Sequence, residues 1–181
     1  AEVLKKMISE QELSVKLEMD CRFYGNVPSF NVIGEMHGHK KNEVITFGGH
    51  LDSWDMGEGA HDDGAGIAHS IESLRILKQL EYKPERTLRV VLFMNEENGN
   101  MGGKSYAKWV SEERGEEHIA ALESDAGGGV PYGFGIVGNE KQVKFVRRFG
   151  EIFYDFGIYV LDPGYGGVDI GPLRDYYPDI L

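Results

Sequence analysis

The sequence predicts an α/β fold with a mixed, mostly parallel central sheet flanked by helices. Three observations lead to this prediction. Apolar and polar residues alternate near the start of the chain, which is typical of half-buried strands. From residue 64 the apolar spacing changes to three and four residues, which is typical of an amphipathic helix. Residues 88–94, LRVVLFM, are continuously apolar, as in a central strand covered on both faces.

The expected elements follow the order β-β-β-α-β-α-β-α-β. Residues 13–24 alternate cleanly, and residues 30–36 and 43–50 are apolar and β-branched, so three strands are expected there. A helix over 64–80 precedes the central strand. The later elements are a short helix at 104–110, a strand at 119–123, a helical stripe over 143–156, a short strand at 159–161 and a helix start at 172–177. Two antiparallel strands followed by alternation indicate a mixed-sheet sandwich.

Composition excludes several classes of protein. The 181 residues are 41% apolar and 27% charged, close to globular averages, which excludes a disordered or fibrous chain. The net charge of −11 argues against a nucleic-acid partner. No apolar run reaches the roughly 18 residues of a membrane span, and the first residues lack the apolar segment of a signal peptide. Cys21 is the only cysteine, and we expect it to be buried on the apolar face of the first strand.

Acidic residues and one histidine follow the expected strands or open the first long helix. They are His50, Asp52, Asp62, Glu96, Glu97 and Asp125. Ligands of α/β sheets bind outside the carboxyl ends of the strands, so these side chains are expected to meet at one edge. Carboxylates this close repel one another, and no Lys or Arg lies inside these motifs, so a metal ion is the simplest counter-charge. One His with several carboxylates suits zinc, and also manganese or cobalt.

The spacing of these residues indicates individual roles. His50 and Asp52 are two residues apart in an extended segment, so their side chains point to the same side. We therefore expect the Asp52 carboxylate to accept the second ring N–H of His50 and to orient a metal-bound imidazole. Glu96 and Glu97 are adjacent and point apart. One of them can bind a metal while the other faces the substrate as general base.

Four motifs, GGHLDSW, AHDDGAG, FMNEENG and ESDAG, occur in a characteristic order and spacing. Together they resemble the co-catalytic di-zinc aminopeptidase family of zinc exopeptidases, and most closely its plasma glutamate carboxypeptidase-like branch. The resemblance covers residues 28–175. It implies the zinc-exopeptidase (phosphorylase/hydrolase-like) fold, two zinc ions, and hydrolysis of N-terminal peptide bonds or dipeptides by a metal-activated water.

The resemblance also implies ligands for each ion. His50 and Asp125 bind the first zinc ion, Asp62 bridges both ions, and Glu97 binds the second ion. In this family the peptide bond after the bridging aspartate is commonly cis, so a cis bond is expected between Asp62 and Asp63.

Two further roles are implied for residues beside the ligands. Glu96 is the general base that takes the proton of the water and later delivers it to the leaving amine. Asp52 orients His50.

One family feature is missing from the sequence. The family's second zinc takes a His from a later loop, and no His follows His118 here. We therefore expect a weak or absent second metal and low activity. We also expect residues 1–181 to form a single zinc-peptidase catalytic domain that is incomplete at its C-terminal end, with its N-terminal completeness left open.

The segment GYGGVDIGP at 164–172 resembles the family's loop that lines the substrate side chain, which makes Gly166 and Asp169 candidate substrate-binding residues. The implied partners are short peptides or dipeptides, and dimer formation is left open. Relatives that contain GGHLDSWD are mostly secreted, periplasmic or lipoproteins, so an extracellular, periplasmic or lipoprotein-anchored location is implied.

Two other functions are compatible with this fold. A catalytically weak or inactive binding module agrees with the missing His. A single-zinc aminoacyl cyclase is less favoured, because it needs neither the bridging Asp62 nor a Glu-Glu pair, and both are present. The sequence leaves aminopeptidase, dipeptidase and carboxypeptidase activity open.

Overall fold

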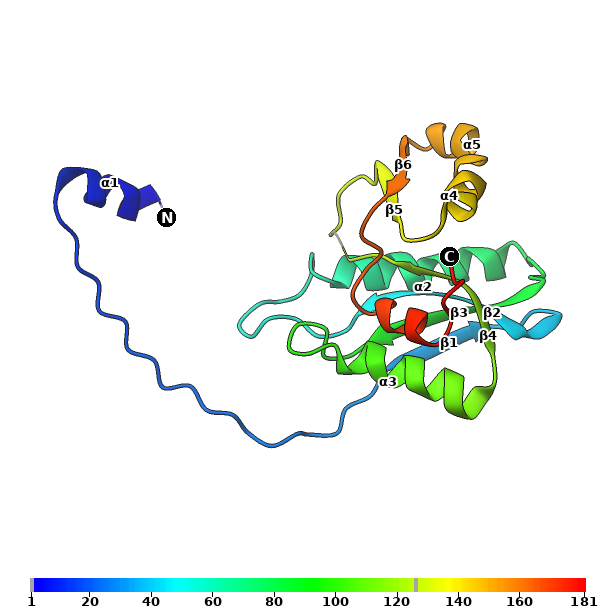
Figure 1. Cartoon of the computed structure of the whole chain (residues 1–181), viewed down its shortest axis with the longest axis horizontal. Coiled ribbons are helices and arrows are strands. Elements are labelled where there is room, and N and C mark those ends of the chain that lie inside the picture. Colours follow the sequence, from blue (N-terminus) through cyan, green and yellow to red (C-terminus); the bar gives the residue numbers. More distant parts are fainter. Residues whose placement is uncertain (1, 126) are drawn as a thin grey trace.

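A mixed four-stranded sheet is the centre of the structure, a computed structural model that describes residues 2–125 and 127–181 (Figure 1). Its strands are β1 (Val32–Met36), β2 (Lys40–His50), β3 (Arg86–Phe93) and β4 (Glu117–Glu123). They lie in the order β1-β3-β2-β4. β3 and β4 run parallel to β2, and β1 runs antiparallel to β3 at one edge. The predicted mixed, mostly parallel sheet is therefore confirmed.

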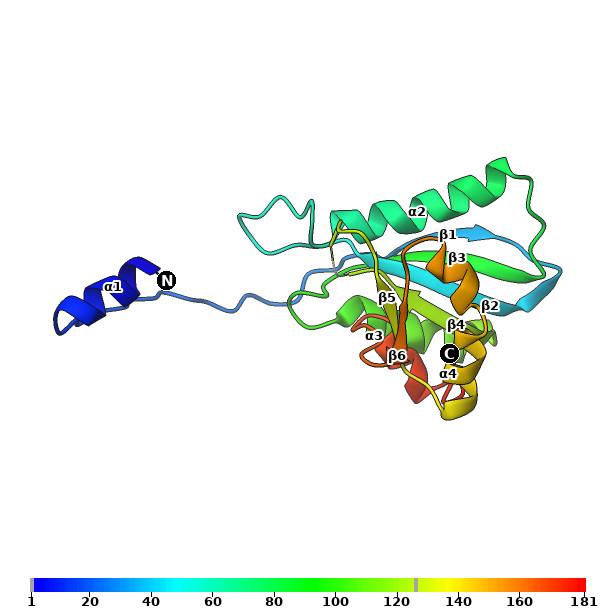
Figure 2. The same ribbon diagram turned by 90° about the horizontal axis from the view of Figure 1, so that it is seen from above.

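Helices cover both faces of this sheet (Figure 2). α2 (Gly64–Gln79) lies on one face. α3 (Met101–Trp109) lies on the other, continues into the π-helical turn η1 (Val110–Arg114), and packs beside the 3₁₀ helix η2 (Gly171–Asp175). The main apolar core lies on the α3 side of the sheet and consists of Val91, Phe93, Tyr106, Ala107, Val110, Leu173 and Ile180. Burial of these side chains holds β3 against α3.

A small second sheet follows the main one in the chain. Its two parallel strands are β5 (Gly133–Ile136) and β6 (Val160–Pro163). Between them run α4 (Glu140–Arg147) and α5 (Gly150–Tyr154), and these elements share a second apolar core around Ile136, Val143 and Leu161.

The predicted helical stripe over 143–156 is therefore two helices and not one. α4 ends with Arg148 as its C-cap, and α5 begins at Gly150. A glycine inside a helix costs about 1 kcal/mol relative to alanine, which favours an interruption at this position. β5 was not predicted, because a four-residue strand of sequence GFGI shows no alternation of apolar and polar residues.

The predicted strand at 13–24 is wrong. The chain forms α1 (Glu2–Glu10), which the sequence did not predict, and then extends without helix or strand until Val32 (Figure 1). The apolar residues of this segment are exposed, from 72% for Val15 to 107% for Phe23, and Cys21 is exposed instead of buried. Alternation predicts which face a strand would bury, but a strand also needs a partner backbone, and none of the described residues pairs with this segment.

The other predicted elements are confirmed with shifted ends. The strand expected at 30–36 begins at Val32, the strand expected at 43–50 begins at Lys40, and the helix expected at 64–80 ends at Gln79. Within the described ranges, no helix is both long and apolar enough to cross a membrane.

Candidate metal centre

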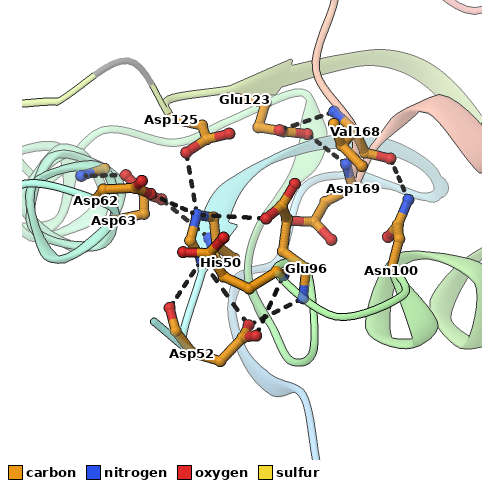
Figure 3. A network of polar contacts seen from close by, with 12 residues as sticks. His50, Asp52, Asp62, Asp63, Glu96, Asn100, Glu123, Asp125, Val168 and Asp169 are labelled. Carbon is orange, nitrogen blue, oxygen red and sulfur yellow. Dashed lines mark hydrogen bonds and ion pairs between the residues drawn. The ribbon is translucent and has the colours of Figure 1, made fainter. Parts of the chain in front are cut away.

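The carboxyl ends of three parallel strands bring the predicted ligands together (Figure 3). His50 is the last residue of β2, and Glu96 follows the end of β3 by three residues. Asp125 follows the end of β4 by two residues, and Asp62 lies in the loop between β2 and α2. The sheet topology therefore gathers side chains that are far apart in the sequence.

His50 is the centre of this cluster. Its side chain is 1% exposed, and its Nε2 atom lies 3.0 Å from Asp62 Oδ1 and 3.1 Å from Asp125 Oδ1. Glu96 Oε2 lies 3.9 Å from the same nitrogen. Two overlapping groups could hold a metal ion: His50 with Asp62 and Asp125, and His50 with Glu96 and Glu97. In each group the candidate ligand atoms lie within 4.8 Å of one another.

The hydrogen bond of the second ring nitrogen of His50 indicates which tautomer the neutral ring adopts. Nδ1 lies 2.9 Å from the backbone carbonyl oxygen of Asp52. A carbonyl oxygen can only accept, so Nδ1 carries the hydrogen and the lone pair of a neutral ring is on Nε2, which faces the carboxylates. Asp52 thus orients His50, as predicted, although through its backbone.

The contact predicted for the Asp52 carboxylate is wrong. Its Oδ1 lies 3.8 Å from His50 Nδ1, which is beyond hydrogen-bond distance. Instead, Oδ1 accepts the backbone N–H of Glu96 at 3.0 Å and Oδ2 accepts that of Glu97 at 3.3 Å. The carboxylate is occupied by these two amides and therefore orients the Glu-Glu loop.

Asp63 has a role at this site that the sequence analysis missed. Its Oδ2 accepts the backbone N–H of His50 at 2.9 Å, and its Oδ1 accepts that of Gly66 at 3.0 Å as the N-cap of α2. A Cβ atom at Gly49 would lie 2.0 Å from Asp63 Oδ2, so only glycine permits this approach. The peptide bond between Asp62 and Asp63 is cis, as predicted. The helix-capping preference of aspartate indicates the Gly66 contact, but no sequence signal indicates the His50 contact.

The electrostatics of the cluster are those of a cation site. Burial alone would lower the pKa of His50, but the Asp52 carbonyl and the nearby negative charges, Asp125 first, raise that pKa to about 9. Burial raises the pKa of Glu96, and the His50 imidazole opposes this only in part. Burial likewise raises the pKa of Asp63 to about 6. In the part of the chain that the structure describes, the ion pairs of these carboxylates are with His50 and include no Lys or Arg.

The donor set fits zinc. Zinc binds imidazole nitrogen and carboxylate oxygen at about 2.0–2.2 Å, so two ligands of one tetrahedral ion lie roughly 3.3 Å apart. The separations of 3.0 and 3.1 Å from His50 Nε2 are close to that value. Glu97 Oε1 is a further indication, because it is buried without a hydrogen-bond partner among the described residues.

Of the two candidate substrate-binding residues, Asp169 lies beside this cluster. Asp169 is fully buried, and Figure 3 shows its side chain next to that of Glu96. Neither of its carboxyl oxygens has a hydrogen-bond partner within residues 2–125 and 127–181, and burial raises its pKa to about 8. Gly166 packs against Val137, where a Cβ atom would lie 2.7 Å from the valine Cγ2.

Comparison with known families places the chain among metallopeptidases. The sequence profile of peptidase family M28 matches residues 31–165. The chain belongs to peptidase family M28. Human carboxypeptidase Q is 39% identical to this M28 chain over 169 residues, which are 92% of the chain and 36% of that protein. The chain thus spans about a third of the length of its curated relatives.

Solved structures agree with the M28 assignment. The peptidase M28 precursor from Shewanella amazonensis superposes with a TM-score of 0.73 at 38% identity, covering 81% of this chain and 33% of that one. BSAP, a zinc aminopeptidase from Bacillus subtilis, superposes with a TM-score of 0.63 at 21% identity, covering 83% of this chain and 38% of that one, and shows the shared fold. The α/β fold predicted from the sequence is the fold of these peptidases.

Proposed function

We propose that this M28 chain carries the metal centre of a zinc-dependent exopeptidase that hydrolyses N-terminal peptide bonds or dipeptides. The observation that carries the proposal is the position of His50 Nε2, within 3.1 Å of carboxylate oxygens from two separate loops. Membership of family M28 supports peptide hydrolysis, and the zinc aminopeptidase among the solved relatives supports zinc as the metal.

Each ligand is given a role in this proposal. His50, Asp62 and Asp125 hold the first ion, and Asp62 with Glu97 contributes to a second. Zinc, when bound, acidifies water and polarises the substrate carbonyl group.

Glu96 is the proposed general base. Its carboxylate lies 3.9 Å from His50 Nε2, at the side of the cluster away from Asp62, so it can reach a water placed beside the metal ligands. Burial raises its pKa towards neutrality, which suits a group that first accepts and then donates a proton. Glu96 takes the proton of the attacking water and delivers it to the amine that leaves. Gly166 and Asp169 line the substrate side of the site.

The experiment compares the chain with its Glu96→Gln variant after both are loaded with zinc. Bound metal is counted by elemental analysis, and turnover is measured with aminoacyl-nitroanilides and dipeptides, which also separates aminopeptidase from dipeptidase activity. We expect equal zinc content and a loss of turnover of about 10²–10⁴-fold in the variant. Equal turnover of the two proteins would remove Glu96 from the mechanism.

A weak or inactive peptidase-fold binding module is the second candidate. In that case the chain binds zinc and peptides but neither protein shows turnover. The substrate class, the number of zinc ions and a location outside the cytoplasm stay predictions.

A further inference from the structure

Glu123 at the end of β4 makes an unusual set of contacts. Its Oε1 accepts the backbone N–H of Val168 at 3.0 Å. Its Oε2 accepts the backbone N–H groups of Asp169 at 2.9 Å and of Ile170 at 3.0 Å. One carboxylate thus binds three consecutive amides of a segment that lies 45 residues further along the chain. Consecutive backbone N–H groups of this kind form a concave site for an anion, and here the anion is a side chain of the protein itself.

The local sequence is suited to this contact. Gly167 has a φ of +104°, a left-handed conformation that glycine adopts without strain. A Cβ atom at Gly167 would lie 2.5 Å from Glu123 Oε2. Glycine at this position therefore lets the backbone turn and lets the carboxylate approach the amides.

The same segment is held from its other side. Asn100, the N-cap residue of α3, donates a hydrogen bond from Nδ2 to the carbonyl oxygen of Val168 at 2.6 Å. Gly103 in α3 allows the carbonyl oxygen of Asp169 to approach, because a Cβ atom there would lie 2.4 Å from it. Residues 164–170, named here the 164–170 loop, are thus clamped between β4 and the start of α3 (Figure 3).

Glu123 and Asn100, which hold this loop, both lie in segments that also carry residues of the candidate metal centre. Glu123 precedes Asp125 by two residues on the same strand end, and Asn100 follows Glu97 by three residues in the Glu-Glu loop. A carboxylate that accepts three hydrogen bonds and is partly buried contributes more than a solvated surface acid, since hydrogen bonds to charged groups are stronger than those between neutral groups. The position of the 164–170 loop is therefore set by the two segments that carry Asp125 and Glu96.

We propose that Glu123 is a positioning residue that ties the 164–170 loop to the metal centre, so that the order of this loop and the binding of a peptide depend on its carboxylate. The part that concerns peptides rests on the proposed function. Glu123 is in neither of the two groups of described residues that could hold a metal ion. It holds the backbone that places Asp169 beside Glu96 and exposes Tyr165, 76% accessible, at the rim of the site.

The first test measures hydrogen–deuterium exchange of the amides of Val168, Asp169 and Ile170 in the zinc-loaded chain. In Glu123→Gln, the side chain keeps its size but has only one acceptor oxygen. We expect these three amides to exchange at least about tenfold faster than in the wild type. Glu117→Gln, at the exposed start of the same strand, is the matched control and should leave the exchange unchanged.

The second test approaches the same contact from the loop. Gly167→Ala places a methyl group against the Glu123 carboxylate and should accelerate exchange at the same amides. Zinc affinity, measured by calorimetry, should change by less than about threefold in Glu123→Gln, because this residue is not a ligand. For dipeptides we expect KM to rise about tenfold and kcat to change less, a split that general destabilisation does not produce.

Two outcomes would overturn the proposal. The first is wild-type exchange at the three amides in Glu123→Gln, and the second is a loss of zinc affinity as large as that of a ligand variant. If the wild-type chain shows no turnover, the proposed function fails by itself, and the exchange and zinc measurements still decide the role of Glu123.

Discussion

The carboxylate of Asp52 accepts the backbone N–H of Glu96 through Oδ1 at 3.0 Å. Asp52 follows β2 and Glu96 follows β3, so this hydrogen bond joins the loops of two neighbouring parallel strands. The backbone carbonyl of Asp52 meanwhile receives the Nδ1–H of His50. One residue therefore sets both the orientation of the imidazole and the position of the proposed general base.

Replacement of Asp52 tests this double role. Asp52→Ala removes the acceptor of two backbone amides but keeps the carbonyl that His50 uses. We expect a loss of about 1.5–3 kcal/mol in the free energy of unfolding, because the amides of Glu96 and Glu97 lose a charged acceptor. Urea unfolding of the metal-free chain measures this. Asp55→Ala, at an exposed position of the same loop, is the control and should cost less than about 0.5 kcal/mol. Equal losses in the two variants would contradict the anchoring role.

Zinc binding should release a proton from His50. The pKa of His50 in the metal-free chain is about 9, so the ring is protonated at pH 7, whereas a metal ligand must be neutral. We therefore expect zinc affinity to rise about tenfold for each pH unit up to about 9, with at least one proton released per ion at pH 7. Calorimetry in two buffers of different ionisation enthalpy measures the proton count.

A histidine outside the cluster provides the control for this prediction. His39→Ala, in the exposed turn between β1 and β2, should leave both the affinity and the proton count unchanged. An affinity that does not vary between pH 6 and 8 would show that zinc binds without His50.

The sequence predicts that the candidate ligands meet at one edge of the sheet, because their position depends on topology alone. His50, Glu96 and Asp125 follow strands that run parallel, and residues at the carboxyl ends of parallel strands meet whatever the details of packing. The contacts of Asp52, Asp63 and Glu123 depend instead on a few ångströms of loop geometry. An extended spacing of two residues places the Asp52 side chain on the same side as that of His50. It does not tell whether the backbone carbonyl or the carboxylate of Asp52 accepts the hydrogen bond from the His50 ring.

The N-terminal segment shows the same limit for secondary structure. Its alternation of Val15, Leu17 and Met19 is as regular as that of a buried strand, yet these side chains are exposed. Periodicity describes one strand, whereas a sheet is a property of pairs. The strand at 88–94 is predicted correctly, because a continuously apolar strand must be covered on both faces of its sheet. β3 is mostly buried, and it pairs with β1 on one edge and with β2 on the other.

Arg89 should be the most costly charged residue to replace far from the metal centre. Its side chain is 1% exposed and donates to Glu116 at 2.7 and 2.9 Å and to Glu35 at 2.6 Å. Removing one partner of a buried ion pair leaves the others uncompensated, which costs about 3–5 kcal/mol. We expect this loss in the free energy of unfolding for Arg89→Met, measured in urea at pH 7.

The matched control is a salt bridge of similar geometry on the surface. Arg75 pairs with Glu72 at 2.5 Å on α2, with about half of each side chain exposed (50% and 48%). Exposed pairs contribute roughly 0–1 kcal/mol, so Arg75→Met should have little effect. A comparable loss in both variants would mean that burial of Arg89 does not decide its contribution.

Asp169 should make the stability of the metal-free chain depend on pH. Burial, and then the charge of Glu123, raises the pKa of Asp169 from 3.8 to about 8. Below pH 3.8, the ordinary pKa of this carboxyl group, Asp169 is neutral in both the folded and the unfolded chain. Between 3.8 and about 8 the folded chain holds a proton that the unfolded chain releases, so stability falls as pH rises, by at most about 1.4 kcal/mol per pH unit. Above about 8 the penalty is constant.

Asp169→Asn removes this ionisation while keeping the size of the side chain. We expect the variant to be more stable than the wild type above pH 8, by at most about 6 kcal/mol, and the difference to vanish near pH 3. Thermal unfolding with a chelator present, from pH 3 to 9, measures both curves. Asp175→Asn, at an exposed position in η2, should follow the wild-type curve throughout. If the wild-type and Asp169→Asn curves were parallel over this range, the Asp169 carboxyl group would have to be solvated or paired in the folded chain, and its burial without a partner would not describe the protein in solution.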